Sequence, residues 1–156
     1  PARVRKLLLL STWARPDAYF RLAIRNWMNI RRSNMPFEQV IRFVSRWQFT
    51  PAFYENEERY EAVVQLMANN PYAQTQHGFL RQADALLAHD PGDAAKGIRA
   101  QTRVLVGALD NLTPPYLSER LAGLIPGATL KVLDCAHSGI VEIPGAYSAA
   151  ILELLE

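Results

Sequence analysis

Two short apolar runs, each leading into a loop with a proton-handling side chain, constrain this sequence most. Val104–Ala108 is followed by Asp110, and Thr129–Leu133 is followed by His137. A helical pattern separates the two runs, and strands separated by helices favour parallel pairing with right-handed crossovers. We therefore predict an α/β fold in which a carboxylate and an imidazole at adjacent strand ends form a hydrogen-bonded pair.

The nucleophile that usually accompanies such a pair has no counterpart in the sequence. No G-x-S-x-G turn occurs in the 156 residues. Residues 3–10 predict a further strand, buried on both faces, which favours a central position in a parallel sheet. Only two later strands exist to flank it, so the sequence predicts half of a sheet that a companion segment completes.

The section between residues 14 and 95 has helical periodicity instead. Asp17 is a plausible N-cap for its first helix, and Pro36 can occupy the first position of the second. The helices expected in the whole chain are, in order, 17–32, 36–49, 55–70, 75–88, 115–124 and 144–155. We therefore divide the chain into a core, residues 1–13 and 96–156, and a mostly helical section, residues 14–95.

Composition excludes several classes of protein. The chain is 49% hydrophobic with a net charge of +2, which is not a disordered composition. No apolar run approaches the roughly 20 residues of a membrane span, and no signal peptide is evident, so we expect a cytoplasmic protein. We expect no metal and no cofactor, because His77, His89 and His137 are scattered without a cysteine cluster. The single cysteine, Cys135, is expected to be a small buried residue and not a nucleophile.

The small net charge conceals an asymmetry. Residues 1–50 contain ten Lys/Arg and two Asp/Glu, whereas the remainder contains seven and thirteen. A basic segment near Trp13, Trp27 and Trp47 leaves nucleic-acid binding as an alternative. No nucleic-acid motif accompanies it, so we favour a solvated helix face or a face that meets an acidic partner. We expect neither nucleic acid nor membrane as a partner.

Two loop patterns in the last third of the sequence are those of a known family. Residues 107–114 read Gly-Ala-Leu-Asp-Asn-Leu-Thr-Pro, and residues 136–144 read Ala-His-Ser-Gly-Ile-Val-Glu-Ile-Pro. They resemble the G-x-x-D-x-x-x-P acid loop and the G-H-x-x-x-x-E-x-P histidine loop of α/β-hydrolases of the cap-bearing esterase, enol-lactonase and C–C hydrolase type. The resemblance covers only the C-terminal half of such a protein, and Ala136 stands where glycine is commonest.

The resemblance implies roles for these residues. Asp110 and His137 take the second and third places in a Ser–Asp–His triad. Some family members carry the acid after the sixth strand, but Ser11-Thr12-Trp13 offers no carboxylate there. Residues 14–95 become a cap, and the serine, the oxyanion hole and the first five strands come from an N-terminal half or a partner chain. The expected substrate is an ester, lactone or diketone-type small molecule.

Other residues near these loops receive expected roles. Trp13 follows the first strand at the edge where open α/β sheets bind ligands, so we expect Trp13 to line the substrate pocket. Ser138, beside the histidine, is a second candidate for substrate contact. Glu142 is interpreted as a contact to local backbone, and His89-Asp90 as a feature of a helix end. Aromatic and sulfur-containing side chains at helical spacing indicate a cap core or a substrate box: Trp27, Trp47, Phe49, Phe53 and Met67.

A function of a different class remains open at this point. The chain could be a non-catalytic α/β-hydrolase-like binding or regulatory subunit, in which Asp110 and His137 are vestiges. Labelling of a partner chain by a serine-directed fluorophosphonate would separate this alternative from an enzyme.

Overall fold

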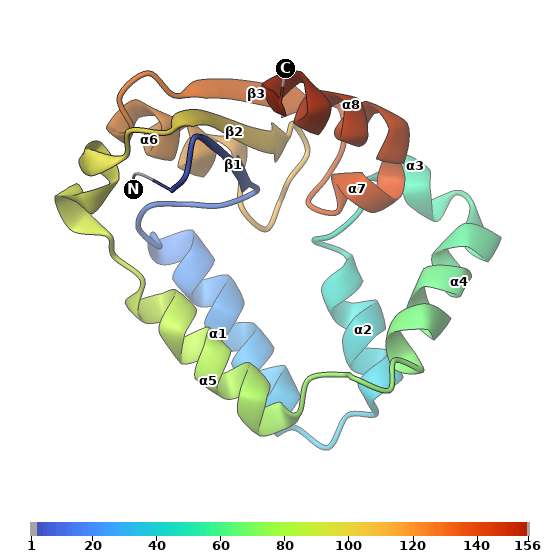
Figure 1. Ribbon diagram of the computed structural model, residues 1–156. Helices are drawn as coiled ribbons and strands as arrows, with labels where there is room; N and C mark the ends of the chain where they lie inside the picture. Colours follow the sequence, from blue (N-terminus) through green and yellow to red (C-terminus); the bar gives the residue numbers. More distant parts are fainter. Residues whose placement is uncertain (1–2, 156) are drawn as a thin grey trace. The chain divides into compact units, whose positions relative to one another are not determined.

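The computed structural model describes residues 3–155, and the chain divides into two compact units (Figure 1). The first, called here the sheet unit, consists of the chain up to Arg15 and from Asp90 onward. The second, the helical unit, comprises Pro16–His89. The sheet unit carries the predicted acid and imidazole, so its architecture determines the site.

The sheet unit contains three parallel strands, as the sequence predicts. They are β1 (Lys6–Leu10), β2 (Gln101–Gly107) and β3 (Thr129–Leu133), in the spatial order β1-β2-β3. Within the described sheet β2 is the middle strand and β1 forms one edge, so the central position of the first strand in a completed sheet stays a prediction. The leucines of β1 are consistent with an edge of the described sheet, since Leu7, Leu8 and Leu9 are only partly buried.

Helices cover both faces of this sheet. Successive residues of β2 point to opposite faces. Val104 packs in a cluster with Leu121 and Ile125, from α6 (Pro115–Leu124) and its C-cap. Leu105 packs on the other face with Tyr147 and Ala150 of α8 (Pro144–Leu155). Short helices η1 (Gly92–Gly97) and α7 (Gly139–Glu142) complete the unit.

The helical unit consists of α-helices, most of which begin at a residue whose side chain caps the first turn. They are α1 (Ala18–Arg32), α2 (Phe37–Ser45), α3 (Pro51–Tyr54), α4 (Glu57–Ala68) and α5 (Gln76–Ala88). Asp17 caps α1 by accepting a hydrogen bond from the Phe20 amide at 2.9 Å, as expected from the sequence. Thr50 and Thr75 cap α3 and α5 in the same way.

Pairs of helices and aromatic side chains form the interior of this unit. Helix α1 packs against α5, and α2 packs against α4. The rings of Phe49 and Phe53 stack with their centroids 4.3 Å apart, and those of Trp27 and Trp47 meet at 5.9 Å. These contacts favour the interpretation of the aromatic residues as interior packing.

The main differences from the expected elements lie at boundaries. The second expected helix ends at Ser45, and residues after Thr50 form the separate short helix α3. Pro36 is the N-cap of α2 and not its first helical residue. Strand β2 begins at Gln101, three residues before the predicted start, because it pairs with β1 from Lys6 onward.

The chain leaves and re-enters the sheet unit at neighbouring points. Arg15, the last residue before the helical unit, donates from Nε to Asp90 Oδ1 at 2.7 Å. Both side chains are at least half exposed, so the pair adds little stability. It shows, however, that the two crossing points are close together. Within residues 3–155, no helix combines the length and the apolar character needed to cross a membrane.

Candidate active site

The site begins where β2 and β3 come to their carboxyl ends. A Cβ on Gly107 would lie against the carbonyl oxygens of Cys135 and Ala136, closer than side-chain carbons come to other atoms. Two hydrogen bonds join the segments there, from Ala108 N to Leu133 O at 2.7 Å and from Leu109 N to Cys135 O at 3.0 Å. The absence of a side chain at Gly107 therefore allows the loop after β2 to run directly beside the loop after β3.

Asp110, in the first of these loops, has hydrogen-bond partners at both carboxylate oxygens. Its side chain is buried, with Oδ1 accepting from the amides of Leu112 at 2.9 Å and Thr113 at 2.8 Å. Oδ2 lies 2.8 Å from Thr113 Oγ1 and 2.9 Å from His137 Nδ1. A buried carboxylate with this many donors is held in one orientation.

His137 is held by the loop after β3. Its Nδ1 faces Asp110, and its side chain is 24% exposed. The Glu142 carboxylate accepts a hydrogen bond from the Ala136 amide at 2.9 Å, which fixes the backbone just before the histidine. This confirms the interpretation of Glu142 as a contact to local backbone.

The pair has the geometry of an acid that orients a base. When Nδ1–H donates to the carboxylate, the imidazole is fixed in the tautomer whose Nε2 has a free lone pair. Nε2 can then take a proton from a nucleophile and later return it, while Asp110 stabilises the protonated ring. The residues assembled here can thus supply general acid–base chemistry.

Several known proteins are similar to this chain over nearly all of its length. No family model matches the chain. A relative from Azorhizobium caulinodans, provisionally named carbamate hydrolase RutD, is 29% identical over 160 residues, which cover 97% of this chain and 57% of that protein. Among solved structures, a hydrolase from Pseudomonas aeruginosa superimposes with a TM-score of 0.83 at 24% identity, covering 98% of this chain and 56% of that one.

An enol-lactonase from Burkholderia xenovorans gives a TM-score of 0.81 at 22% identity, again over 98% of this chain and 56% of its own. The chain has the fold of the C-terminal part of an α/β-hydrolase. It spans just over half the length of the curated relatives it matches and corresponds to their C-terminal part. The three strands described above are therefore a portion of an α/β-hydrolase sheet.

Cys135 lies two residues before His137, but its environment is not that of a nucleophile. The thiol is buried, and burial, with smaller contributions from Glu142 and Asp110, raises the pKa of Cys135 to about 11. A thiol with so high a pKa is almost entirely protonated at neutral pH and is a poor nucleophile. The structure confirms that Cys135 is a small buried residue.

The remaining predicted residues have definite places. Trp13 follows β1 and is partly buried, and Ser138 is the N-cap of α7; contact of either residue with a substrate stays a prediction. His89 is the C-cap of α5 and Asp90 is paired with Arg15, which confirms the helix-end interpretation. Across residues 3–155, no group of three or more His, Cys, Asp or Glu side chains could hold a metal ion.

Sequence reasoning missed two residues that support the acid. Thr113 reaches Asp110 through both its amide and its hydroxyl, and Ser11 accepts a hydrogen bond from that hydroxyl at 3.0 Å. The position of Thr113 could have been noticed, because a threonine three residues after an aspartate often closes a local turn. Nothing in the sequence around Ser11 signals its contact, which spans 102 positions.

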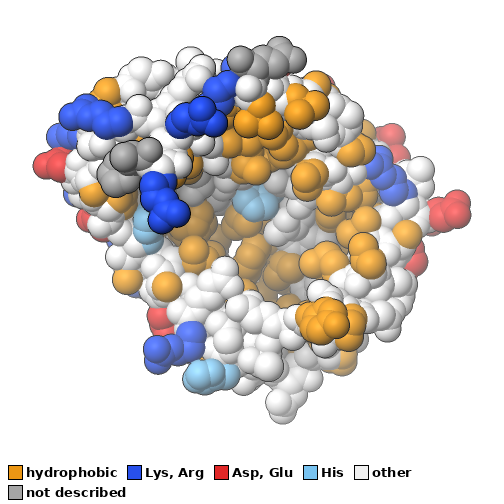
Figure 2. Space-filling view, viewed as in Figure 1, with side chains coloured by type: hydrophobic (Ala, Val, Ile, Leu, Met, Phe, Trp, Pro, Cys, Tyr) orange, Lys and Arg blue, Asp and Glu red, His pale blue; other side chains and the backbone are white. Residues whose placement is uncertain are grey.

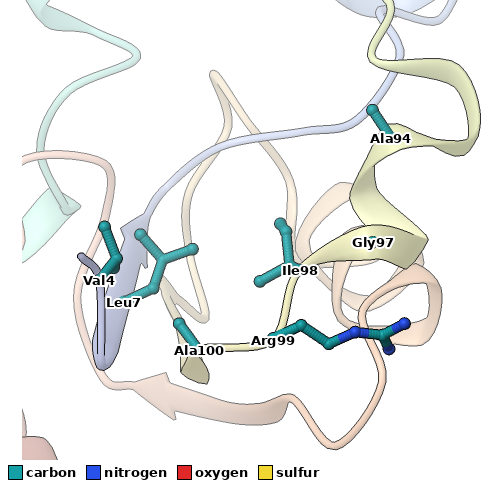
Figure 3. A pocket seen from close by; sticks show the side chains of 7 residues that line it. All are labelled: Val4, Leu7, Ala94, Gly97, Ile98, Arg99 and Ala100. Atoms are coloured by element: carbon teal, nitrogen blue, oxygen red, sulfur yellow. The ribbon is translucent and has the colours of Figure 1, made fainter. Parts of the chain in front are cut away.

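A separate apolar hollow lies at the amino end of the sheet, away from the pair. It has a volume of about 290 Å³ between the start of β1 and the η1–β2 connection (Figure 3). Its lining residues are Val4, Leu7, Ala94, Gly97, Ile98, Arg99 and Ala100. Since the Asp–His pair is at the carboxyl end of the strands, this hollow is not part of the acid–base site.

Proposed function

We propose that this chain supplies the acid, the base and the cap of a serine hydrolase that acts on an ester, a lactone or a related carbonyl compound. In this proposal the nucleophilic serine and the oxyanion hole come from an N-terminal segment or partner outside this sequence. The observation that carries the proposal is the 2.9 Å contact between His137 Nδ1 and the buried Asp110 carboxylate at the carboxyl end of the sheet.

The proposed steps follow from this contact. His137 Nε2 removes the proton from the serine hydroxyl as the oxygen attacks the carbonyl carbon. The protonated imidazole, stabilised by Asp110, then gives that proton to the leaving group, and an acyl-enzyme forms. In the second half, His137 takes a proton from water, hydroxide attacks the acyl carbon, and the proton returns to the serine oxygen.

The open side of the sheet supports the need for another segment. Within the described chain, β1 pairs only with β2, so its outer edge has no neighbouring strand. Val4 is 49% exposed and Leu10 is 40% exposed near that edge, and the hollow in Figure 3 lies between the start of β1 and the η1–β2 connection. On the face shown in Figure 2, hydrophobic side chains reach the surface in several places. An apolar sheet edge of this kind is suited to being covered.

The substrate class is proposed more broadly than a single compound. Esters, lactones and carbamates each offer a carbonyl carbon to a serine and a leaving group to a protonated imidazole. The provisional name of the RutD relatives makes carbamates a sensible first test beside simple esters. The helical unit, with its aromatic interior, is proposed to act as the cap that selects among such substrates.

The proposal is tested by reconstitution. Residues 1–156 would be co-expressed with the N-terminal segment of the same protein, and hydrolysis of p-nitrophenyl acetate would be measured together with labelling by a fluorophosphonate probe. We expect turnover and labelling of the N-terminal segment. We expect His137→Ala to abolish turnover, and His89→Ala, at the end of α5, to leave it unchanged.

Two results would contradict the proposal. Turnover by the purified 156-residue chain alone would show that its nucleophile lies within this sequence. A complex that forms but neither reacts with the probe nor hydrolyses esters, lactones or carbamates would favour the binding or regulatory subunit instead.

A further inference from the structure

The hydroxyl of Thr113 contacts groups at the ends of all three strands. Its Oγ1 lies 2.8 Å from Asp110 Oδ2, in the loop after β2, and 3.2 Å from His137 Nδ1, in the loop after β3. It also lies 3.0 Å from the carbonyl oxygen of Ser11, which directly follows β1. Thr113 is 1% exposed, so these protein groups, and not bulk water, surround the hydroxyl.

Counting protons shows what this hydroxyl can do. A threonine hydroxyl has one proton to donate and two lone pairs that can accept. The Asp110 carboxylate and the Ser11 carbonyl only accept, whereas His137 Nδ1 carries a proton in the tautomer described above. The hydroxyl can therefore donate to one of the two oxygens while it accepts a shared bond from Nδ1–H. With either oxygen as the acceptor, the hydroxyl stays within hydrogen-bond distance of both the carboxylate and the imidazole.

The Ser11 end of this chain of contacts is itself fixed. Ser11 has a φ of +41°, a left-handed backbone conformation that a residue with a side chain rarely adopts. Its amide donates to Leu105 O at 2.8 Å, and its side chain is hydrogen-bonded to Tyr147 on α8. A strained conformation persists only where its surroundings determine it, and such residues gather at functional sites.

We propose that Thr113 is a positioning residue, whose hydroxyl holds the Asp110 carboxylate and the His137 ring in register by anchoring both to the Ser11 carbonyl. Its effect on turnover rests on the proposed function, but its effect on the hydrogen-bonded pair does not. Partners that orient metal ligands typically change activity ten- to a hundredfold when they are removed, and we expect an effect at the lower end, about tenfold, for this partner of the imidazole.

Two substitutions separate the hydroxyl from the packing of the side chain. Thr113→Val keeps the branched shape and loses the hydroxyl, whereas Thr113→Ser keeps the hydroxyl and loses the methyl group. If Thr113 only fills space, the valine variant should behave like the wild-type chain and the serine variant should be the more disturbed. If the hydroxyl positions the pair, the order is reversed.

The first readout is the NMR signal of the His137 Nδ1 proton in the complex with the N-terminal segment, which requires no turnover. We expect a slowly exchanging signal in the wild-type chain and in Thr113→Ser, and its loss or marked broadening in Thr113→Val. Retention of the wild-type signal in Thr113→Val would overturn the proposal. Should that variant fail to fold, the Thr113 hydroxyl proton of the wild-type chain decides: a protected signal with a cross-peak to the His137 ring proton supports the proposal, and its absence overturns it.

The second readout is catalysis in the reconstituted complex. We expect Thr113→Val to lower kcat about tenfold with KM little changed, because ground-state binding does not need the aligned pair. Thr113→Ser should recover kcat to within about threefold. A rise in KM at unchanged kcat would overturn the positioning role. If no complex turns over while the NMR arm follows the expected order, the proposed function fails and the positioning role stands.

Discussion

The sheet unit and the helical unit differ in how deeply their hydrogen-bonded polar side chains are buried. In the sheet unit, Asp110, Thr113 and Ser118 are buried, and each has hydrogen-bond partners near the strand ends. In the helical unit, Arg42 bridges Glu38 and Glu61 with all three side chains more than one-third exposed. Ser45 is a buried polar residue of the helical unit, and its hydroxyl is hydrogen-bonded to that of Tyr60.

This difference shows where geometry is specified. A buried polar group is costly unless its partners are in place, so the loops at the strand ends have little freedom to rearrange. Exposed ion pairs tolerate more change. We therefore expect substitutions of polar groups in the sheet unit to have large effects through particular atoms, and those of polar groups in the helical unit to have small effects.

The largest effect is expected at the acid. Asp110→Asn keeps an oxygen for the Leu112 and Thr113 amides but presents an amide to His137, which favours the wrong imidazole tautomer. We expect turnover in the reconstituted complex to fall at least about 1,000-fold, measured by ester hydrolysis. Asp93→Asn, in an exposed pair with Lys96, is the matched control. A variant that retains a tenth of the activity would remove Asp110 from the proposed triad.

A second large effect concerns the thiol beside the base. Burial raises the pKa of Cys135 from 9.0 to about 11, so the thiolate fraction at pH 8 should be about 100-fold lower than for an ordinary cysteine. We expect alkylation by iodoacetamide to be slow in the folded chain at pH 8 and to accelerate as the pH approaches 11. The urea-unfolded chain is the reference, and equal rates in the two states at pH 8 would contradict this environment.

The close approach of the two loops gives a stability test. Gly107→Ala places a methyl group against backbone atoms of residues 135 and 136 that cannot move aside. We expect the free energy of unfolding in urea to fall by about 3 kcal/mol. Gly123→Ala, on α6 with nothing near its Cβ position, should instead gain about 0.5 kcal/mol. Equal effects of the two substitutions would show that the loops are not packed as described.

A moderate effect is expected in the helical unit. Asp17→Ala removes the side chain that caps α1 at the Phe20 amide. We expect a loss of about 1 kcal/mol in the free energy of unfolding. Asp84→Ala, at an exposed interior position of α5, removes the same charge without removing a cap and should be nearly neutral. A loss as large as that of Gly107→Ala would break the contrast between the two units.

The smallest effect should come from a surface ion pair of the sheet unit. Lys131 Nζ donates to both carboxylate oxygens of Glu153 at 2.6 and 2.7 Å, and this lowers the pKa of Glu153. Because the pKa of Glu153 is lower in the folded chain, the ion pair stabilises the fold at pH values above the pKa of an ordinary carboxyl group. This contribution is lost as the pH falls through the lowered pKa. Glu153→Gln should therefore lower stability slightly at pH 7, with no difference from the wild-type chain in strong acid.

Much of the fold could be predicted because local patterns determine it. The bounds of α6, β3 and α8 agree with the predicted 115–124, 129–133 and 144–155, since proline starts and apolar periodicity mark them. The proximity of Asp110 to His137 could also be predicted, because both loops follow the carboxyl ends of neighbouring parallel strands. The order of the strands was harder to predict, since a leucine run does not show which strand lies on each of its two sides.

The supporting contacts of the site were harder to predict. The contact between Thr113 and Ser11 joins residues whose neighbours in the sequence give no sign of each other. The role of Gly107 depends on how closely another backbone passes, and only the folded chain defines that distance. Sequence patterns identify the groups that carry the chemistry, whereas the tertiary structure identifies the groups that hold them.

The ion pair between Arg15 and Asp90 has a practical consequence for protein engineering. Because 74 residues depart and return within the reach of two side chains, a short glycine–serine bridge would be long enough to replace them. The same two positions would accept an equivalent segment from a relative, giving chimaeras that share the Asp110–His137 pair and differ in the helical unit. The natural segment and the engineered one would then join the chain at the same two positions.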